Sequence, residues 1–531
     1  MKSPLEVLRS YRPHNGTLDD AFASRCARKG DVSFIIQGNV QLSWREFGAR
    51  YKKLASALAA RGVGHGDRVA VIGPNDVVHV LALFALAQLG AIMVPVNPGF
   101  GTRELDYVLG HAQVQGIIAH DSLQGLLEQC TPRLTQEPWM LTWGQADSQG
   151  PDSLAAAIDS APDETPATDA AAGDTCVIIY TSGTTGFPKG VMHSQENLVT
   201  AGEANVARVH LQPEDRAMVI LPFFHMNALF YSVGGTLAAG ASLIVEPRFS
   251  ASRFWDTVAD NGATVVNIIE AIGTILCARD RSEYRPDHRL RAVYGVRRKS
   301  APVFRKDFGV PQLFSGFGMT EIPGVTCNPY DGPDKEGSMG TVGSHPDPSR
   351  PWAQCRVVDD EGRDVAAGAI GELWVKSPIV MQGYFRDPEQ TRKAFDNGWL
   401  KTGDLVKCDA DGFYFHVSRK KDIIRRRGEN IAAAELEMVI GEHPGVFQAA
   451  ALAVPSELGE DDIFVAVAAR PQASLTESDI VAWCARRLAA VKVPRYVVLL
   501  DSLPYTATHK IAKAALRDDP QIRAKAVDFQ H

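Results

Sequence analysis

Short apolar runs alternate along the first part of the chain with longer segments that carry a helical pattern. The runs include RVAVI at 68–72, GIIA at 116–119 and CVIIY at 176–180. A short, continuously apolar run suits a strand buried on both faces of a parallel sheet, which the intervening helices then cover. The sequence therefore predicts an α/β fold with helices packed on stacked parallel and mixed sheets.

The chain has 531 residues, which is more than one hydrophobic core ordinarily holds, so we expect more than one domain. Its character changes after Phe413: SRKKDIIRRRGEN is basic and polar, and short strands then surround further helices. Thr476 and Asp479 have the spacing of a helix N-terminal cap in this part. We place a boundary near residue 420, which predicts a large N-terminal domain, 1–420, and a small C-terminal α+β domain, 421–531.

Charge and cysteine content exclude some classes of protein. The net charge of −7 is spread without long runs of one sign, so we expect no nucleic-acid partner. The eight cysteines lie far apart, without a CxxC pair, as in a protein with reduced thiols in the cytoplasm.

No membrane span is expected either. The most apolar stretch, 77–96, is interrupted by His79, Gln88, Gly90 and Pro95, and it divides better into a buried helix and a short strand. The N-terminal segment MKSPLEVLRSYRPHNG lacks the apolar core of a secretory signal. We therefore expect a cytoplasmic protein.

A loop of phosphate-binding composition follows the CVIIY strand. It comprises Thr181, Ser182, Gly183, Thr184, Thr185, Gly186, Phe187, Pro188, Lys189 and Gly190. Glycines let backbone N–H groups converge on an anion, hydroxyls add donors, and the lysine adds a charge. The spacing differs from that of P-loop NTPases, which place four residues between the glycines and a Ser or Thr after the lysine. A surface turn without a ligand is the alternative.

The loop, read as YTSGTTGFPKGVMHS, resembles the signature of the adenylate-forming superfamily, which includes acyl-CoA synthetases, luciferases and peptide-synthetase adenylation domains. Further family motifs follow in order: FFHMNAL (223–229), SGFGMTEI (315–322), GELWV (371–375), GWLKTGDL (398–405), SRKKDIIRRRGEN (418–430) and LPYTATHKIAK (503–513). In style the chain is most similar to the carnitine/crotonobetaine–CoA ligase-like branch.

This resemblance implies an ATP-dependent acid–CoA ligase. A small-molecule carboxylic acid and MgATP would give an acyl-adenylate and pyrophosphate, and coenzyme A would then displace AMP. The N-terminal domain would bind ATP and the acid, and the C-terminal domain would be mobile and carry the catalytic lysine. Oligomeric state cannot be read from the sequence, although homodimers are common among such enzymes.

The resemblance assigns catalytic roles to Lys510, Thr184, Lys189, Glu321 and His225. Glu321 would also be the metal ligand, since Mg²⁺ prefers few carboxylates plus phosphate oxygens. Lys510 would neutralise charge between the attacking carboxylate and the α-phosphate; a plain surface lysine is the alternative. Its neighbour His509 stands where the family has glycine, which leaves the geometry of this lysine open.

Residues implied to bind ATP or coenzyme A lie in both predicted domains. Asp404 would accept hydrogen bonds from the ribose hydroxyls, Lys421 would be the hinge, and Arg425, Arg426 and Arg427 either meet CoA phosphates or form a solvated basic face. The implied cofactor-binding residues are Thr181, Ser182, Gly183, Thr184, Thr185, Lys189, Gly316, Phe317, Gly318, Met319, Thr320, Asp404, Arg419, Gly428, Glu429 and Asn430.

The acyl pocket is implied to comprise Phe224, His225, Met226, Asn227, Asn267, Glu270, Gly295, Gly318 and Ile322. His225 would be an aromatic gate, with a packed core histidine as the alternative. Glu270 stands where proline is expected, and Arg297, Arg298 and Lys299 replace small neutral residues. Glu270 suggests a cationic or hydroxylated acid, whereas the basic cluster suggests a second carboxylate; we favour internal pairing between Glu270 and one of these arginines.

Two other functions stay open. One is an adenylating enzyme that loads a carrier-protein thiol in trans. The other is a catalytically silent protein that binds acyl nucleotides, for which His509 and the altered YGVRRKS segment (294–300) are the support.

Overall fold

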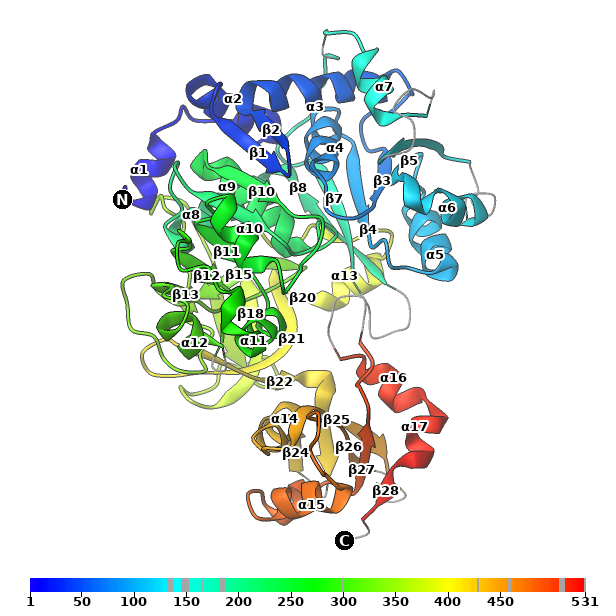
Figure 1. Cartoon of the computed structure of the whole chain (residues 1–531), viewed down its shortest axis with the longest axis vertical. Coiled ribbons are helices and arrows are strands. Elements are labelled where there is room, and N and C mark those ends of the chain that lie inside the picture. Colours follow the sequence, from blue (N-terminus) through cyan, green and yellow to red (C-terminus); the bar gives the residue numbers. More distant parts are fainter. Residues whose placement is uncertain are drawn as a thin grey trace. The chain divides into compact units, whose positions relative to one another are not determined.

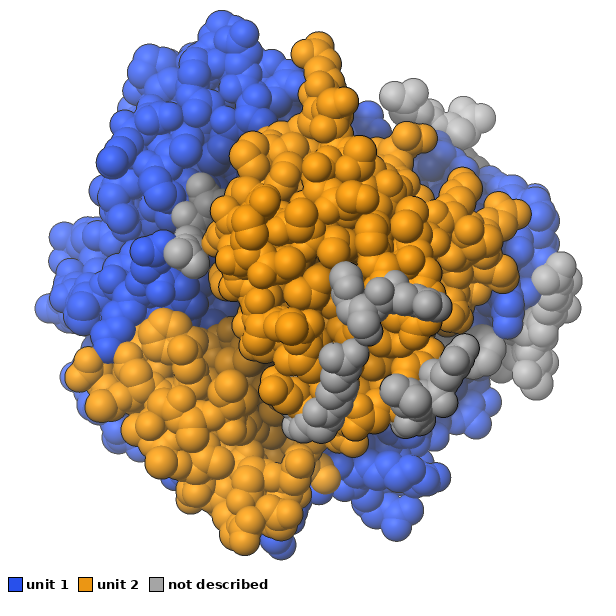
Figure 2. Space-filling model, turned by 90° about the horizontal axis from the view of Figure 1, so that it is seen from below, with its two compact units in different colours: residues 1–354, 375–400 blue, residues 355–374, 401–531 orange. Residues whose placement is uncertain are grey.

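The computed structural model divides into two compact units, shown in different colours in Figure 2: residues 1–354 with 375–400, and residues 355–374 with 401–531. The predicted domain boundary near residue 420 stays a prediction. The described residues are 1–130, 137–144, 152–164, 166–181, 188–297, 300–426, 429–456, 460–505 and 511–529.

The first sheet of the first unit contains the predicted apolar strands. Its strand order is β19-β8-β7-β4-β3-β5-β6, and β3, β4, β5, β6 and β7 run parallel (Figure 1). The strands β8 and β19 add antiparallel pairs at one edge. Their bounds are β3 Arg68–Ile72, β4 Ile92–Val96, β5 Gly116–His120, β6 Trp139–Trp143, β7 Thr175–Thr181, β8 Lys189–Ser194 and β19 Gly383–Tyr384.

A second sheet has the order β13-β12-β11-β9-β10-β1-β2. All neighbouring pairs are parallel except β1 with β2. Its bounds are β1 Ser33–Gln37, β2 Val40–Ser43, β9 Arg216–Val219, β10 Ser242–Val245, β11 Val265–Asn267, β12 Ala292–Tyr294 and β13 Gln312–Phe314. A smaller antiparallel sheet contains β14 Gly316–Met319, β15 Ile322–Cys327 and β16 Thr341–Val342.

Helices surround the two large sheets, as the alternation of the sequence predicts. The apolar stretch 77–96 forms α4 and β4, and no helix in the described part of the chain is both long and apolar enough to cross a membrane. The helices are α1 Pro4–Arg9, α2 Leu18–Lys29, α3 Trp44–Ala59, α4 Val77–Gln88, α5 Thr102–Ala112, α6 Gln124–Cys130, α7 Leu154–Asp159, α8 Gln195–Val209, α9 Gly234–Ala239, α10 Phe254–Asp260, α11 Glu270–Ala278, α12 Ala301–Lys306 and α13 Pro388–Ala394.

The second unit combines short sheets with four helices among its described residues, and the α/β fold class is confirmed. Thr476 and Asp479 form the predicted cap of α15 through reciprocal side-chain to backbone hydrogen bonds. Of the remaining strands, β20 Phe395–Asp396 lies in the first unit, and β17 Gln354–Val358, β18 Ile370–Lys376 and β21 Trp399–Cys408 have residues in both units. The other strands of the second unit are β22 Tyr414–Arg419, β23 Ile423–Arg426, β24 Glu429–Ala432, β25 Val446–Pro455, β26 Asp461–Ala469, β27 Tyr496–Leu500 and β28 Val527–Asp528. The helices are α14 Ala433–Gly441, α15 Glu477–Ala485, α16 Lys513–Asp518 and α17 Pro520–Lys525.

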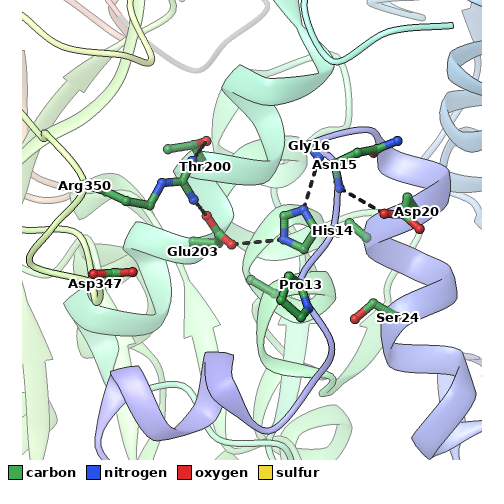
Figure 3. A network of polar contacts seen from close by, with 12 residues as sticks. Pro13, His14, Asn15, Gly16, Asp20, Ser24, Thr200, Glu203, Asp347 and Arg350 are labelled. Carbon is green, nitrogen blue, oxygen red and sulfur yellow. Dashed lines mark hydrogen bonds and ion pairs between the residues drawn. The ribbon is translucent and has the colours of Figure 1, made fainter.

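A buried carboxylate on α8 joins distant segments of the first unit (Figure 3). Glu203 lies 3.1 Å from Nε2 of both His14 and His345 and 2.6 Å from Nη1 of Arg350. Burial alone would raise the pKa of Glu203, but hydrogen bonds from the histidines and the charges of His14 and Arg350 outweigh it and lower this pKa. The cluster therefore fastens the N-terminal segment and the segment around residue 345 to α8.

Candidate active site

The phosphate-binding loop of the sequence connects two paired strands. β7 ends at Thr181, β8 begins at Lys189, and these two residues are partners in the antiparallel ladder. The Nζ atom of Lys189 lies 3.0 Å from Oε1 of Gln390 and 4.9 Å from the centroid of the Tyr384 ring. Ser182, Gly183, Thr184 and Thr185 lie outside the described residues. The paired strand ends thus fix the lysine at the base of the loop.

Tyr384 connects Lys189 to the proposed metal ligand. Its hydroxyl donates a hydrogen bond of 2.8 Å to Oε1 of Glu321, and its ring lies below the Lys189 ammonium. Pairing of β19 with β8 positions it, and the amide of Met381 donates to the carbonyl oxygen of Glu321. A lysine and a carboxylate from two motifs far apart in sequence therefore contact one tyrosine ring.

A buried histidine fastens the GFGMTE motif to the strand that follows the phosphate loop. Nε2 of His193, on β8, lies 2.7 Å from the carbonyl oxygen of Thr320. Burial lowers the pKa of His193 to about 4, so the ring is neutral at physiological pH and its Nε2–H donates. Gly316, Phe317, Gly318 and Met319 form β14, which pairs with β15.

The predicted acyl-pocket residues around FFHMNAL lie at the start of a π-helix, η3 (Asn227–Val233). Such segments are rare and occur frequently at functional sites. The rings of Phe224 and His225 have centroids 4.5 Å apart, and Met226 is half-buried. Oδ1 of Asn227 is buried and has no hydrogen-bond partner among the described residues.

Other predicted pocket residues converge on the far end of η3. Nδ2 of Asn267, at the end of β11, donates to Oγ of Ser232 over 2.9 Å. A Cβ atom added at Gly318 would lie 2.7 Å from the Tyr231 hydroxyl, so only glycine lets β14 approach this tyrosine so closely. Ile322 is buried in β15. The structure therefore brings the η3, β11 and β14 members of the predicted set together.

Glu270 holds a turn and forms no ion pair with any described residue. Its carboxylate accepts hydrogen bonds from the amide of Arg297 at 2.6 Å and from the amide and hydroxyl of Ser300 at 3.1 and 2.7 Å. Gly295 enters this turn with φ of +101°, where a Cβ would collide with the Ile268 carbonyl. No ion pair with the Arg297 side chain is formed, and the predicted pairing of Glu270 with one of the arginines of this segment stays a prediction. Arg298 and Lys299 lie outside the described residues.

In the second unit, Asp404 offers a buried oxygen to a ligand. Its Oδ1 atom accepts from Nε2 of His416 and Nε of Arg419, both at 3.0 Å. Oδ2 is buried and has no hydrogen-bond partner among the described residues, which is costly unless a ligand supplies a donor. A ribose hydroxyl is such a donor, so the residues present fit a nucleotide.

For the remaining predicted residues of this unit, the structure gives fewer side-chain contacts. Lys421 lies in the turn η5 (Lys420–Asp422), and Glu429 and Asn430 lie on β24. The buried side chain of Arg426 donates to the carbonyls of Val491 and Val493 and pairs with Asp462. Arg426 is therefore a structural residue. Arg427, Gly428, His509 and Lys510 lie outside the described residues.

Two models of one enzyme family match the sequence. The AMP-binding enzyme model matches residues 22–385, and the model of the AMP-binding enzyme C-terminal domain matches residues 435–510. The chain belongs to the AMP-binding enzyme family. The resemblance to adenylate-forming enzymes is thereby confirmed.

Relatives of this AMP-binding enzyme match it over nearly its whole length. The long-chain-fatty-acid–CoA ligase FadD13 of Mycobacterium tuberculosis is 31% identical over 490 residues, 90% of this chain and 93% of the relative. A crotonobetaine/carnitine–CoA ligase of Escherichia coli is 27% identical over 505 residues, 90% of this chain and 93% of the relative. The ATP-bound structure of MatB from Rhodopseudomonas palustris has a TM-score of 0.85 and 29% identity, covering 94% of this chain and 98% of that one.

Sequence reasoning did not single out Tyr384, Gln390, His193 or His416 in this AMP-binding enzyme. Tyr384 lies between a glycine and the Asp387–Pro388 helix start. This pattern indicates a turn but does not indicate a residue that contacts substrate. His193 is the next-to-last residue of the signature motif YTSGTTGFPKGVMHS, and no residue of the motif indicates that it contacts the backbone at Thr320.

Proposed function

We propose that Lys189, Glu321 and Asp404 bind the nucleotide in the reaction of this AMP-binding enzyme. At the level of reaction class the protein is an ATP-dependent, AMP-forming acid–CoA ligase. A carboxylate oxygen of the acid attacks the α-phosphorus of ATP, and the bond to pyrophosphate breaks. The thiol of coenzyme A then attacks the acyl carbon, loses its proton, and AMP leaves.

The observation that carries the residue assignment is the Lys189–Tyr384–Glu321 contact. A cation and a carboxylate held 4.9 and 2.8 Å from parts of the same side chain suit a polyphosphate with its divalent ion. The described residues contain no cluster of three metal-ligating side chains. Glu321 would therefore hold Mg²⁺ together with phosphate oxygens, which Mg²⁺ prefers to an all-protein cage.

The orphaned Oδ2 of Asp404 supports ribose binding in the second unit. Arg419, which donates to the other oxygen, keeps the carboxylate oriented. For the later steps we propose Lys510 as the residue that stabilises the developing charge at the α-phosphate, Lys421 as the hinge between residues 1–420 and 421–531, and residues 428–430 as part of the CoA channel.

The test is ATP–pyrophosphate exchange and pyrophosphate release with a panel of aliphatic, aromatic, betaine and dicarboxylic acids. Lys510→Ala should abolish exchange and keep ATP binding, while Arg517→Ala, a nearby basic change outside the proposed site, should keep both. A protein that binds ATP but exchanges no pyrophosphate with any acid would be the silent binder instead.

The thiol acceptor is decided by measuring AMP release with coenzyme A and with a phosphopantetheinylated carrier protein. We expect the reaction with coenzyme A to be faster. We further propose a homodimer and a cytoplasmic location, for which light scattering of the purified protein and cell fractionation are the direct measurements.

A further inference from the structure

Arg208, near the end of α8, is a buried cation for which no described residue supplies a counter-ion. The residue is 8% exposed, a hydrogen bond joins its side chain to that of Tyr231, and its Nη1 atom is buried with no hydrogen-bond partner among the described residues. Its guanidinium carbon lies 4.9 Å from the ring centroid of Tyr231 and 5.9 Å from that of Tyr294. Burying a charge in this way is costly unless a partner binds it.

The polar neighbours of Arg208 do not supply a negative charge. Burial raises the pKa of Tyr231 and of Tyr294, and it raises the pKa of Cys327 to about 12. All three are therefore neutral at physiological pH, whereas a guanidinium stays protonated. Stacking on tyrosine rings uses the face of the guanidinium, and the N–H groups of the unpaired Nη1 remain available for an oxyanion.

The position of this cation connects it to the acyl pocket. A Cβ atom added at Gly324 would lie 2.3 Å from a guanidinium nitrogen of Arg208, and one added at Gly318 would lie 2.7 Å from the Tyr231 hydroxyl and from the Gly324 amide. The side chain of Arg208 thus lies directly behind the β14–β15 hairpin that carries Gly318.

The parallel strands β11 and β12 end side by side, at the same edge of the second sheet. Tyr294 is the last residue of β12 and Asn267 the last of β11, and the two are register partners. Ligands of α/β sheets bind at the carboxyl ends of the strands. Arg208 therefore lies where substrate is expected in such a sheet.

We propose that Arg208 recognises a second anionic group of the acid substrate, at the end remote from the carboxylate that is activated. The substrate class is then a dicarboxylic acid or another acid with a second oxyanion. This inference rests on the proposed function of the site. Glu270, which the sequence suggested for specificity, is not needed for it, because its carboxylate already accepts three hydrogen bonds.

The first test uses the wild-type enzyme and pyrophosphate release. A series from malonic to adipic acid is compared with the monomethyl esters of the same acids, which keep the size and remove the second charge. We expect kcat/KM for the best dicarboxylic acid to exceed that of its half-ester about 100-fold, as for a site left with an unpaired polar group. Equal or better use of half-esters and simple monocarboxylic acids would overturn the proposal.

The second test uses Arg208→Met and Arg208→Lys. Both should lose most of the preference for the diacid, with kcat/KM for the half-ester unchanged or improved in Arg208→Met. Arg25→Met is the matched control, because Arg25 is also buried and lies over a tyrosine ring, but it donates to the carbonyls of Ala21 and Ala238. It should lower the melting temperature without changing acid preference.

The outcomes separate this inference from the proposed function. Absence of pyrophosphate release with every acid would remove the proposed function itself. Release with monocarboxylic acids alone, or a folded Arg208→Met variant with the wild-type diacid preference, would remove only the role of Arg208. Should Arg208→Met not fold, the half-ester comparison on the wild type decides.

Discussion

Nε2 of His193 donates a 2.7 Å hydrogen bond to the carbonyl oxygen of Thr320, which joins the strand after the phosphate loop to the motif that ends in Glu321. Because Lys189 begins the same strand β8, this contact helps to fix the spacing between the lysine and the carboxylate, together with the Tyr384 and Met381 contacts of Glu321. Residues that hold reacting groups in the correct geometry in this way increase the rate of the chemical step.

His193→Ala should therefore impair ATP use more than folding. We expect kcat/KM for ATP to fall about 10-fold from lost positioning, with the acid KM little changed. His193→Gln, whose amide can donate to the same carbonyl, should recover part of the loss. Equal defects in both variants would mean that the imidazole only fills space.

Acid should destabilise the protein through its buried histidines. Burial lowers the pKa of His79 and His193 from 6.5 to about 4, so between these pH values the unfolded chain binds protons that the folded chain does not. The stabilising contribution is complete above pH 6.5 and lost as the pH falls towards 4, at about 2 kcal/mol for each histidine by pH 5. Urea unfolding at pH 7 and pH 5 measures this loss, and His193→Gln should have the smaller pH dependence.

The contribution of Glu203 to stability changes over a different, more acidic pH range. Its pKa is lowered from the ordinary 4.5 of a glutamate, so its contribution is present above pH 4.5 and lost as the pH falls through the lower value of the folded state. Glu203→Gln should lower the free energy of unfolding at pH 7 by about 3 kcal/mol, which urea unfolding measures. Its difference from the wild type should shrink below pH 4.5; a difference constant down to pH 3 would contradict the ionic role.

Tyr384→Phe and Tyr384→Leu separate the two contacts of this side chain. Phenylalanine keeps the ring under Lys189 and loses the hydrogen bond to Glu321, so we expect the Mg²⁺ concentration for half-maximal activity to rise several-fold, the effect of about 1 kcal/mol. Leucine removes both contacts and should also raise the KM for ATP. The assay is pyrophosphate release titrated with Mg²⁺, and a leucine variant that behaves like phenylalanine would argue against the ring–lysine contact.

The sequence predicted the α/β class and the main motifs because both depend on local patterns. Residues 69–72, for example, are all apolar and all buried in β3, and the YTSGTTG loop carries its chemistry within a few residues. The contacts that assemble the site could not be predicted this way. Glu321 and Tyr384, which form one such contact, are 63 positions apart, and His193 and Thr320 are 127 positions apart. The types of these residues do not indicate that they pair. The same holds for the hydrogen bonds that Glu270 accepts, because their donors belong to Arg297 and Ser300, 27 and 30 positions away.

The unpaired oxygen of Asp404 predicts how the enzyme discriminates between nucleotides. We expect a ribose hydroxyl to donate a hydrogen bond to that oxygen. Wild-type kcat/KM should then be about 10-fold lower with 2′-deoxy-ATP or 3′-deoxy-ATP than with ATP, because one hydrogen bond to a charged acceptor is lost. Asp404→Ala should be poor with all three nucleotides and nearly indifferent among them, because the partner of the missing hydroxyl has gone. The four combinations of residue and hydroxyl form a double-mutant cycle. His416→Ala, which keeps the carboxylate and the Arg419 contact, is the matched control and should keep the discrimination. Additive effects of Asp404→Ala and the deoxy substitution would show that Oδ2 does not face the ribose.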